Sequence, residues 1–179
     1  MDKSSRLNYD RDNNNNNSLV PEFDKSKFPI IYVHFKKAID SESFQTFLEK
    51  WMECYNYKKD FTFVFNLQNL GWVNPGYCYK LAKFMKSLKL RQQEYPHLKR
   101  SIVVLQNTFI RSLVSIVFRL QPPQSHVFLA PDMIHANGIL RGNREFINSC
   151  VDFPPDQKVN FSSTEKLEMK KIESTINEI

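Results

Sequence analysis

Apolar and polar residues follow one another in blocks that predict strands separated by helices. Four short runs rich in β-branched and aromatic residues predict strands at 30–35, 61–67, 102–105 and 127–129. Longer segments between them carry apolar residues at helical spacing, over 44–52, 77–88 and 109–120. The second run is apolar on both faces, which is typical of an interior strand covered by helices. This order predicts an α/β domain with a mainly parallel sheet of four to five strands and helices on both faces.

Polar and proline residues predict where the helices begin and end. Asp40 or Ser41 can accept hydrogen bonds from the free amides at the start of the first helix. The second helix is expected to end before Tyr95-Pro96, and Pro122-Pro123 should end the third. A fourth helix is predicted near Gly142–Cys150.

The composition changes along the chain and predicts three parts. Residues 1–27 are poor in apolar side chains and contain a run of asparagines, which predicts a disordered tail. Residues 28–153 carry the alternating elements and form the predicted domain. A double proline then begins a linker and C-terminal helix over 154–179, for which Ser162 and Glu165 form a predicted capping box. The apolar members of that helix are Leu167, Ile172, Ile176 and Ile179.

The net charge indicates which partners are expected, and the cysteines indicate the cellular compartment. The net charge is +6, from 25 Lys and Arg against 19 Asp and Glu, but no dense basic cluster supports nucleic-acid binding. Cys54, Cys78 and Cys150 show no paired spacing, which indicates free thiols in a reducing compartment. No apolar run approaches the ~18 residues of a membrane span. We therefore expect a cytoplasmic protein.

Signatures of metal, phosphate and cofactor sites are missing from the pattern. His34, His97, His126 and His135 are dispersed and share no ligand spacing with cysteine, so no metal is predicted. No glycine-rich phosphate loop follows any predicted strand. We predict no cofactor.

Candidate catalytic groups are equally sparse. Cys78 lies near a predicted helix start, where the helix dipole would lower its pKa, and His97 could act as its base. A half-buried packing cysteine explains the same position more simply. Asn66 ends a strand where an α/β enzyme might carry an aspartate, and an amide is no general base. The sequence therefore predicts a protein that is not an enzyme.

The predicted third helix is apolar over more than half of its circumference. A helix on one sheet face needs only one apolar stripe. Its excess apolar surface either packs against later parts of the chain or forms one wall of a cleft for an apolar ligand or a protein partner. The candidate ligand-binding residues are Phe65, Phe109, Leu113, Val117 and Phe118.

A lysine row on the predicted second helix has two interpretations. Lys80, Lys83 and Lys86 recur on one side of that helix. Such a row is usually a solvated face, and it could also contact an anionic membrane surface at about 1 kcal/mol per charge.

Between Phe28 and Pro131 the chain resembles the CRAL-TRIO lipid-binding domain. The resemblance is carried by the opening strand Pro29–His34, the central strand Phe63–Leu70, the pair Tyr95-Pro96 and the run from Val103 to Leu113, which is similar to that family's strand and gate helix. It implies a non-catalytic module that binds a lipid or a similar apolar molecule. The chain departs from the family at Asn66 and Asn69, where Asp and Gly are usual.

The STAS domain shares a similar order of strands and helices and is the second candidate. That family acts through protein–protein contact. Asn74-Pro75-Gly76 stands where its regulated members carry a phosphorylatable serine, so this resemblance implies an interaction domain without a phosphoswitch. The C-terminal helix would then dock on a partner chain.

Overall fold

The structure is a computed structural model that describes residues 19–157 together with 163, 166, 167, 170 and 174. Six strands are present in the described part: β1 (Glu22–Asp24), β2 (Ile30–His34), β3 (Phe61–Asn66), β4 (Leu98–Val104), β5 (His126–Ala130) and β6 (Val151–Phe153). The helices are α1 (Ser41–Cys54), a 3₁₀ turn (Tyr55–Tyr57), α2 (Gly76–Leu90), α3 (Thr108–Leu120), α4 (Met133–Leu140) and α5 (Arg144–Ser149). This is an α/β fold, as the alternating pattern predicts. None of the described helices is long and apolar enough to cross a membrane.

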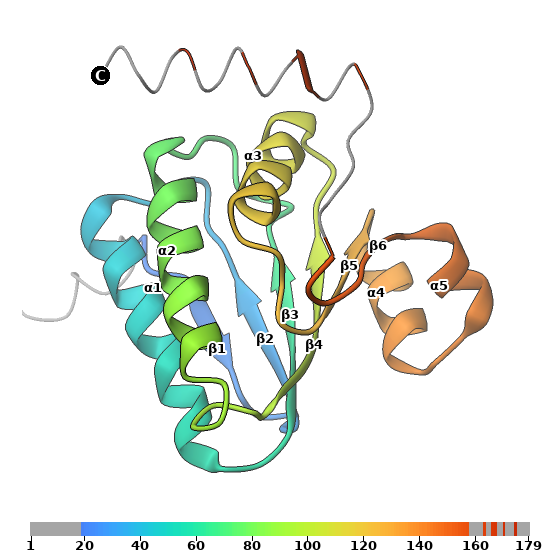
Figure 1. Cartoon of the computed structure of the whole chain (residues 1–179). Coiled ribbons are helices and arrows are strands. Elements are labelled where there is room, and N and C mark those ends of the chain that lie inside the picture. The colour runs from blue at the N-terminus through green and yellow to red at the C-terminus, as the bar shows by residue number, and fades with distance from the viewer. Residues whose placement is uncertain (1–18, 158–162, 164–165, 168–169, 171–173, 175–179) are drawn as a thin grey trace, which may run out of the picture.

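The strands lie in one sheet in the order in which they occur along the chain, β1-β2-β3-β4-β5-β6. Strands β2 to β5 are mutually parallel, with α1, α2 and α3 as their crossovers. Because each such crossover is right-handed and each step moves in the same direction, all three helices are placed on one face. Figure 1 shows α1, α2 and α3 together on one side of the sheet, and α4 and α5 apart from them on the other.

Both edges of the sheet differ from the prediction. β1 pairs with β2 antiparallel, and β6 pairs with β5 antiparallel, so the sheet is mixed rather than mainly parallel and has six strands rather than four or five. Each edge strand has only three residues. Acidic residues Glu22, Asp24 and Asp152 lie on them, which discourages pairing with another chain.

Residues on both sides of the predicted domain 28–153 pair with it or contact it. β1 lies inside the range 1–27 that was predicted as a disordered tail. Its Phe23 ring packs against the rings of Phe47 and Phe63, with centroids 6.0 and 6.4 Å apart. After β6, the Asp156 amide donates to the Pro123 carbonyl at 3.0 Å, so the first residues of the predicted linker contact the domain. The asparagine run and the C-terminal residues Ile172, Ile176 and Ile179 lie outside the described residues. Leu167 is helical and exposed.

Helix caps explain why the helices begin where they do. The Asp40 side chain accepts from the Ser43 amide at 2.8 Å, and that bond lowers the pKa of the Asp40 carboxyl. Asn107 caps α3 in the same way. The predicted fourth helix exists as α5, but α4 before it was not predicted. Its cap is Asp132, which accepts from the His135 amide at 2.9 Å.

Two apolar clusters hold the layers together. The larger one lies between the sheet and α1–α3 and includes Phe61, Phe63 and Phe65 of β3. The smaller one lies on the opposite face, where Val64 and Ile102 are covered by α4, α5 and neighbouring sheet residues. β3 is therefore buried on both faces, as its largely apolar sequence predicts.

Candidate functional site

An apolar cavity of about 160 Å³ lies within the larger cluster, between the sheet and helices α1, α2 and α3. Its walls are almost entirely carbon, and no Lys, Arg, His, Asp or Glu side chain lines it. Since the packing of most protein interiors leaves few voids larger than a water molecule, a hollow of this size is unusual. It is the candidate site.

The structure brings four of the five predicted ligand-binding residues to this cavity. Phe65 lines it from β3, and Leu113, Val117 and Phe118 line it from α3. Phe109 is half-buried in the first turn of α3 and does not line the cavity.

The apolar surface of α3 is covered by several neighbours, yet the hollow beneath it remains. Besides its sheet-facing residues, Ser112 and Ser115 are buried. Phe118 packs against Phe153 of β6, with ring centroids 5.1 Å apart. α4 lies on the opposite face of the sheet and does not cover α3. The excess apolar residues of α3 thus meet both later parts of the chain and the cavity.

The sequence did not predict that α1 and the 3₁₀ turn after it form a wall of the cavity. Trp51 and Tyr55 line the cavity, and their rings are almost wholly buried. Within the described chain, the Trp51 indole nitrogen is the sole buried side-chain nitrogen or oxygen without a hydrogen-bond partner. The helical stripe through Trp51 predicts its burial, but the position of its N–H depends on tertiary packing.

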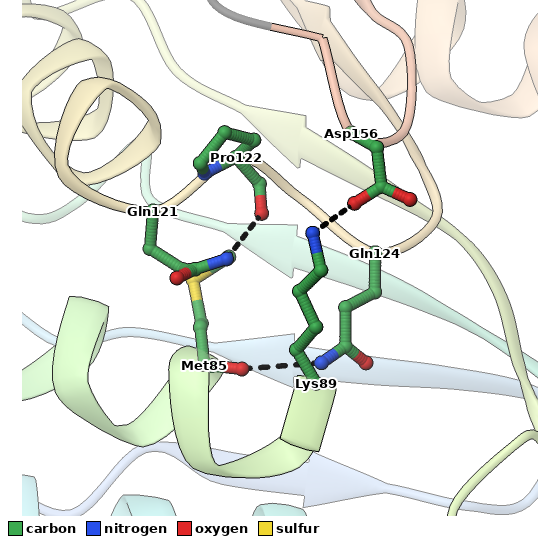
Figure 2. Close-up of polar contacts among 6 residues, drawn as sticks. All are labelled: Met85, Lys89, Gln121, Pro122, Gln124 and Asp156. Carbon is green, nitrogen blue, oxygen red and sulfur yellow. Dashed lines mark hydrogen bonds and ion pairs between the residues drawn. The ribbon is translucent and has the colours of Figure 1, made fainter. Parts of the chain in front are cut away.

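One end of the cavity is closed by the loop that joins α3 to β5. Gln124 lines the cavity, and its amide nitrogen donates to the Met85 carbonyl of α2 at 3.1 Å. Beside it, Lys89 of α2 forms an ion pair with Asp156, and the Gln121 side chain donates to the Pro122 carbonyl at 3.1 Å (Figure 2). The contacts of Gln124 with Met85 and of Asp156 with Lys89 attach the loop and the segment after β6 to α2.

Cys78 and His97, the two residues considered for nucleophilic catalysis, do not contact each other. Cys78 contacts the Leu113 carbonyl, 3.6 Å from its sulfur, whereas the Nδ1 atom of His97 lies 3.5 Å from Asp60. Burial raises the pKa of the Cys78 thiol to about 12, so the lowering expected from the helix start does not occur. Asn66 accepts from the Gln68 amide at 3.1 Å and shapes the turn after β3.

We expect the buried thiols to resist modification. Burial also raises the pKa of Cys54 to about 11, so at pH 8 both buried cysteines are almost wholly protonated. An aromatic disulfide reagent should modify at most Cys150 in the folded protein, and all three thiols after unfolding in urea. The variant C150S should show no modification when folded. Rapid modification of Cys78 in that variant would contradict this assignment.

The lysine row is exposed on α2 and faces acidic residues as well as solvent. Lys80 and Lys83 line a shallow surface groove between α1 and α2, together with Glu42 and Glu49 of α1. Lys86 is exposed and lies outside that groove. The carboxylates reduce the positive potential that an anionic surface would meet.

Among the residues that the structure describes, no three His, Cys, Asp or Glu side chains converge as a metal site would require. No protein-family model matches the chain, and comparisons with curated proteins and with solved structures find no match. Functional interpretation therefore depends on the cavity and on the motifs of the sequence.

Proposed function

We propose that this protein is a non-catalytic binding module, related in form to the CRAL-TRIO domain, whose cavity binds a lipid-like or other apolar small molecule. The observation that carries the proposal is the hollow of about 160 Å³ with almost purely apolar walls. Burial of apolar surface, at about 25 cal/mol per Å², would supply the binding free energy.

The size of the cavity limits the guest. An engineered apolar cavity of about 150 Å³ in another protein stays dry and binds benzene. A hollow of about 160 Å³ accordingly suits a small aromatic molecule or a short isoprenoid or acyl segment. A two-chain phospholipid would need the surrounding helices to move apart.

Toluene is expected to stabilise the folded protein. Because a ligand that binds only the folded state adds RT ln(1 + [L]/Kd), a concentration of about 100 Kd should raise the free energy of unfolding by about 2.7 kcal/mol. Urea unfolding with and without toluene measures this change. Native mass spectrometry of protein expressed in a lipid-rich eukaryotic host should also detect a bound guest.

A cavity-filling variant provides the matched control. Val117 lines the cavity, so V117F should abolish the stabilisation by toluene, whereas V151F at an exposed position of β6 should retain it. If toluene leaves the wild-type protein unchanged and only guest-free protein is found by mass spectrometry, the proposal is wrong.

Exposed aromatic residues before α2 and in its first turn favour a second candidate, a STAS-like interaction domain. Trp72 is 60% exposed and Tyr79 is 42% exposed, on either side of Asn74-Pro75-Gly76. Exposed aromatic side chains of this kind are enriched at protein interfaces. Sedimentation of the full chain against W72A tests self-association through this surface, and an unchanged monomer in both would remove it.

A further inference from the structure

Trp51 carries a polar group that the protein itself leaves unsatisfied. Its side chain is 7% exposed and lines the cavity, and its indole nitrogen has no hydrogen-bond partner in the described chain. The indole nitrogen can only donate. A buried donor without an acceptor destabilises the folded state, so native structures seldom retain one without a reason.

Neighbouring rings hold the Trp51 indole in place. Phe63 and Phe65 of β3 lie 5.2 and 5.0 Å from it, measured between ring centroids, and Phe84 of α2 lies at 5.6 Å. These contacts come from both the sheet and a second helix. These contacts restrict rotation of the indole ring.

Tyr55, in the 3₁₀ turn that follows α1, also lines the cavity and carries a second polar group. Burial raises the pKa of its phenol to about 12, and the nearby Trp51 indole acts in the opposite direction. The phenol is therefore neutral at physiological pH. The Trp51 N–H lies close enough to the phenol to lower its pKa, but the two groups do not reach the geometry of a hydrogen bond.

We propose that the guest of this cavity carries a neutral hydrogen-bond acceptor, such as a ketone, aldehyde or ester oxygen, which accepts from the Trp51 indole N–H. This inference rests on the proposed function and specifies its ligand class. The remainder of the guest is apolar, because the other walls are apolar. A carboxylate is excluded from the cavity, since no cationic side chain lines it to offset the desolvation of a charge.

Acetophenone and α-methylstyrene test this proposal. The two compounds match closely in shape, but acetophenone has a carbonyl oxygen where α-methylstyrene has a methylene group. The chain has two tryptophans, so protein labelled with ¹⁵N-tryptophan shows two indole signals, and W72F assigns them. Acetophenone should move the Trp51 indole proton downfield, and α-methylstyrene should not. The ratio of the two affinities should fall about tenfold in W51F, as expected for one lost hydrogen bond of about 1.4 kcal/mol.

The variant Y55F is the control, because it removes the neighbouring hydroxyl and leaves the proposed donor intact. It should keep both the downfield shift and the affinity ratio of the wild type. If both compounds bind but neither moves the Trp51 signal downfield, the acceptor inference is wrong and the binding module stands. If neither compound binds, the acceptor inference is wrong, and the toluene measurement decides whether the binding module stands. The spectra of the wild-type protein decide these cases even if W51F does not fold.

Discussion

Replacing Phe63 with alanine is expected to lower the free energy of unfolding by about 3–5 kcal/mol. Phe63 is fully buried in β3, at the centre of the sheet, where its ring lies 5.1 Å from Phe61 and 4.9 Å from Phe65. Truncation removes apolar area and leaves a hole that the paired strands on either side cannot close. Since small domains are stable by only about 5–15 kcal/mol, this single change removes a large share of the stability.

Urea unfolding followed by circular dichroism measures the effect, and F63L separates its causes. Leucine keeps most of the apolar volume and should cost clearly less than alanine. L90A provides the surface control, because Leu90 is 79% exposed, and it should change the free energy by less than about 0.5 kcal/mol. A loss of less than about 1 kcal/mol in F63A would mean that β3 is not the centre of the core.

The interior of the fold could be predicted because each interior element has a local signature. β3 is apolar on both faces, and α1 is apolar at helical spacing behind its Asp40 cap. Such patterns depend on residues close together in the sequence. The parallel centre of the sheet follows from their alternation.

The edges of the sheet could not be predicted in the same way. β1 and β6 have three residues each and mix acidic with apolar side chains, so no periodicity distinguishes them from loops. They become strands because Phe23 and Phe153 pack against distant residues, Phe47 and Phe118. Those contacts are non-local and leave no signal in a short window of sequence.

The cavity was predictable in part. One interpretation of the apolar excess of α3 is that the helix forms one wall of a cleft. Leu113 and Val117 of α3 line the cavity. The opposite wall on α1 was missed because Trp51 looks like an ordinary core residue in its helical stripe. Its unsatisfied N–H becomes visible only when every neighbour is in place.

Gly138 lies within α4 where this helix packs against Phe146 of α5, and we expect G138A to lower the free energy of unfolding by about 1–3 kcal/mol. A Cβ atom at this position would lie 2.3 Å from Cδ2 of Phe146 and 2.9 Å from its Cβ. Phe146 belongs to the small apolar cluster that covers the second face of the sheet, and its ring meets the edge of His135 at 5.1 Å. Alanine favours a helix over glycine by about 1 kcal/mol, so the clash must outweigh that gain.

Two variants show whether the clash with Phe146 is the cause. In the F146A background the ring atoms are gone and only the Cβ at position 146, 2.9 Å from the new Cβ, remains, so adding G138A should cost clearly less than it does in the wild type. G71A is the matched glycine control, because its new Cβ would meet only the Lys37 carbonyl oxygen at an ordinary 3.5 Å. Urea unfolding of the four proteins of the cycle gives the coupling energy directly. Equal costs of G138A with and without Phe146 would show that α5 does not pack against α4 as described, and the second face of the sheet would then need another cover.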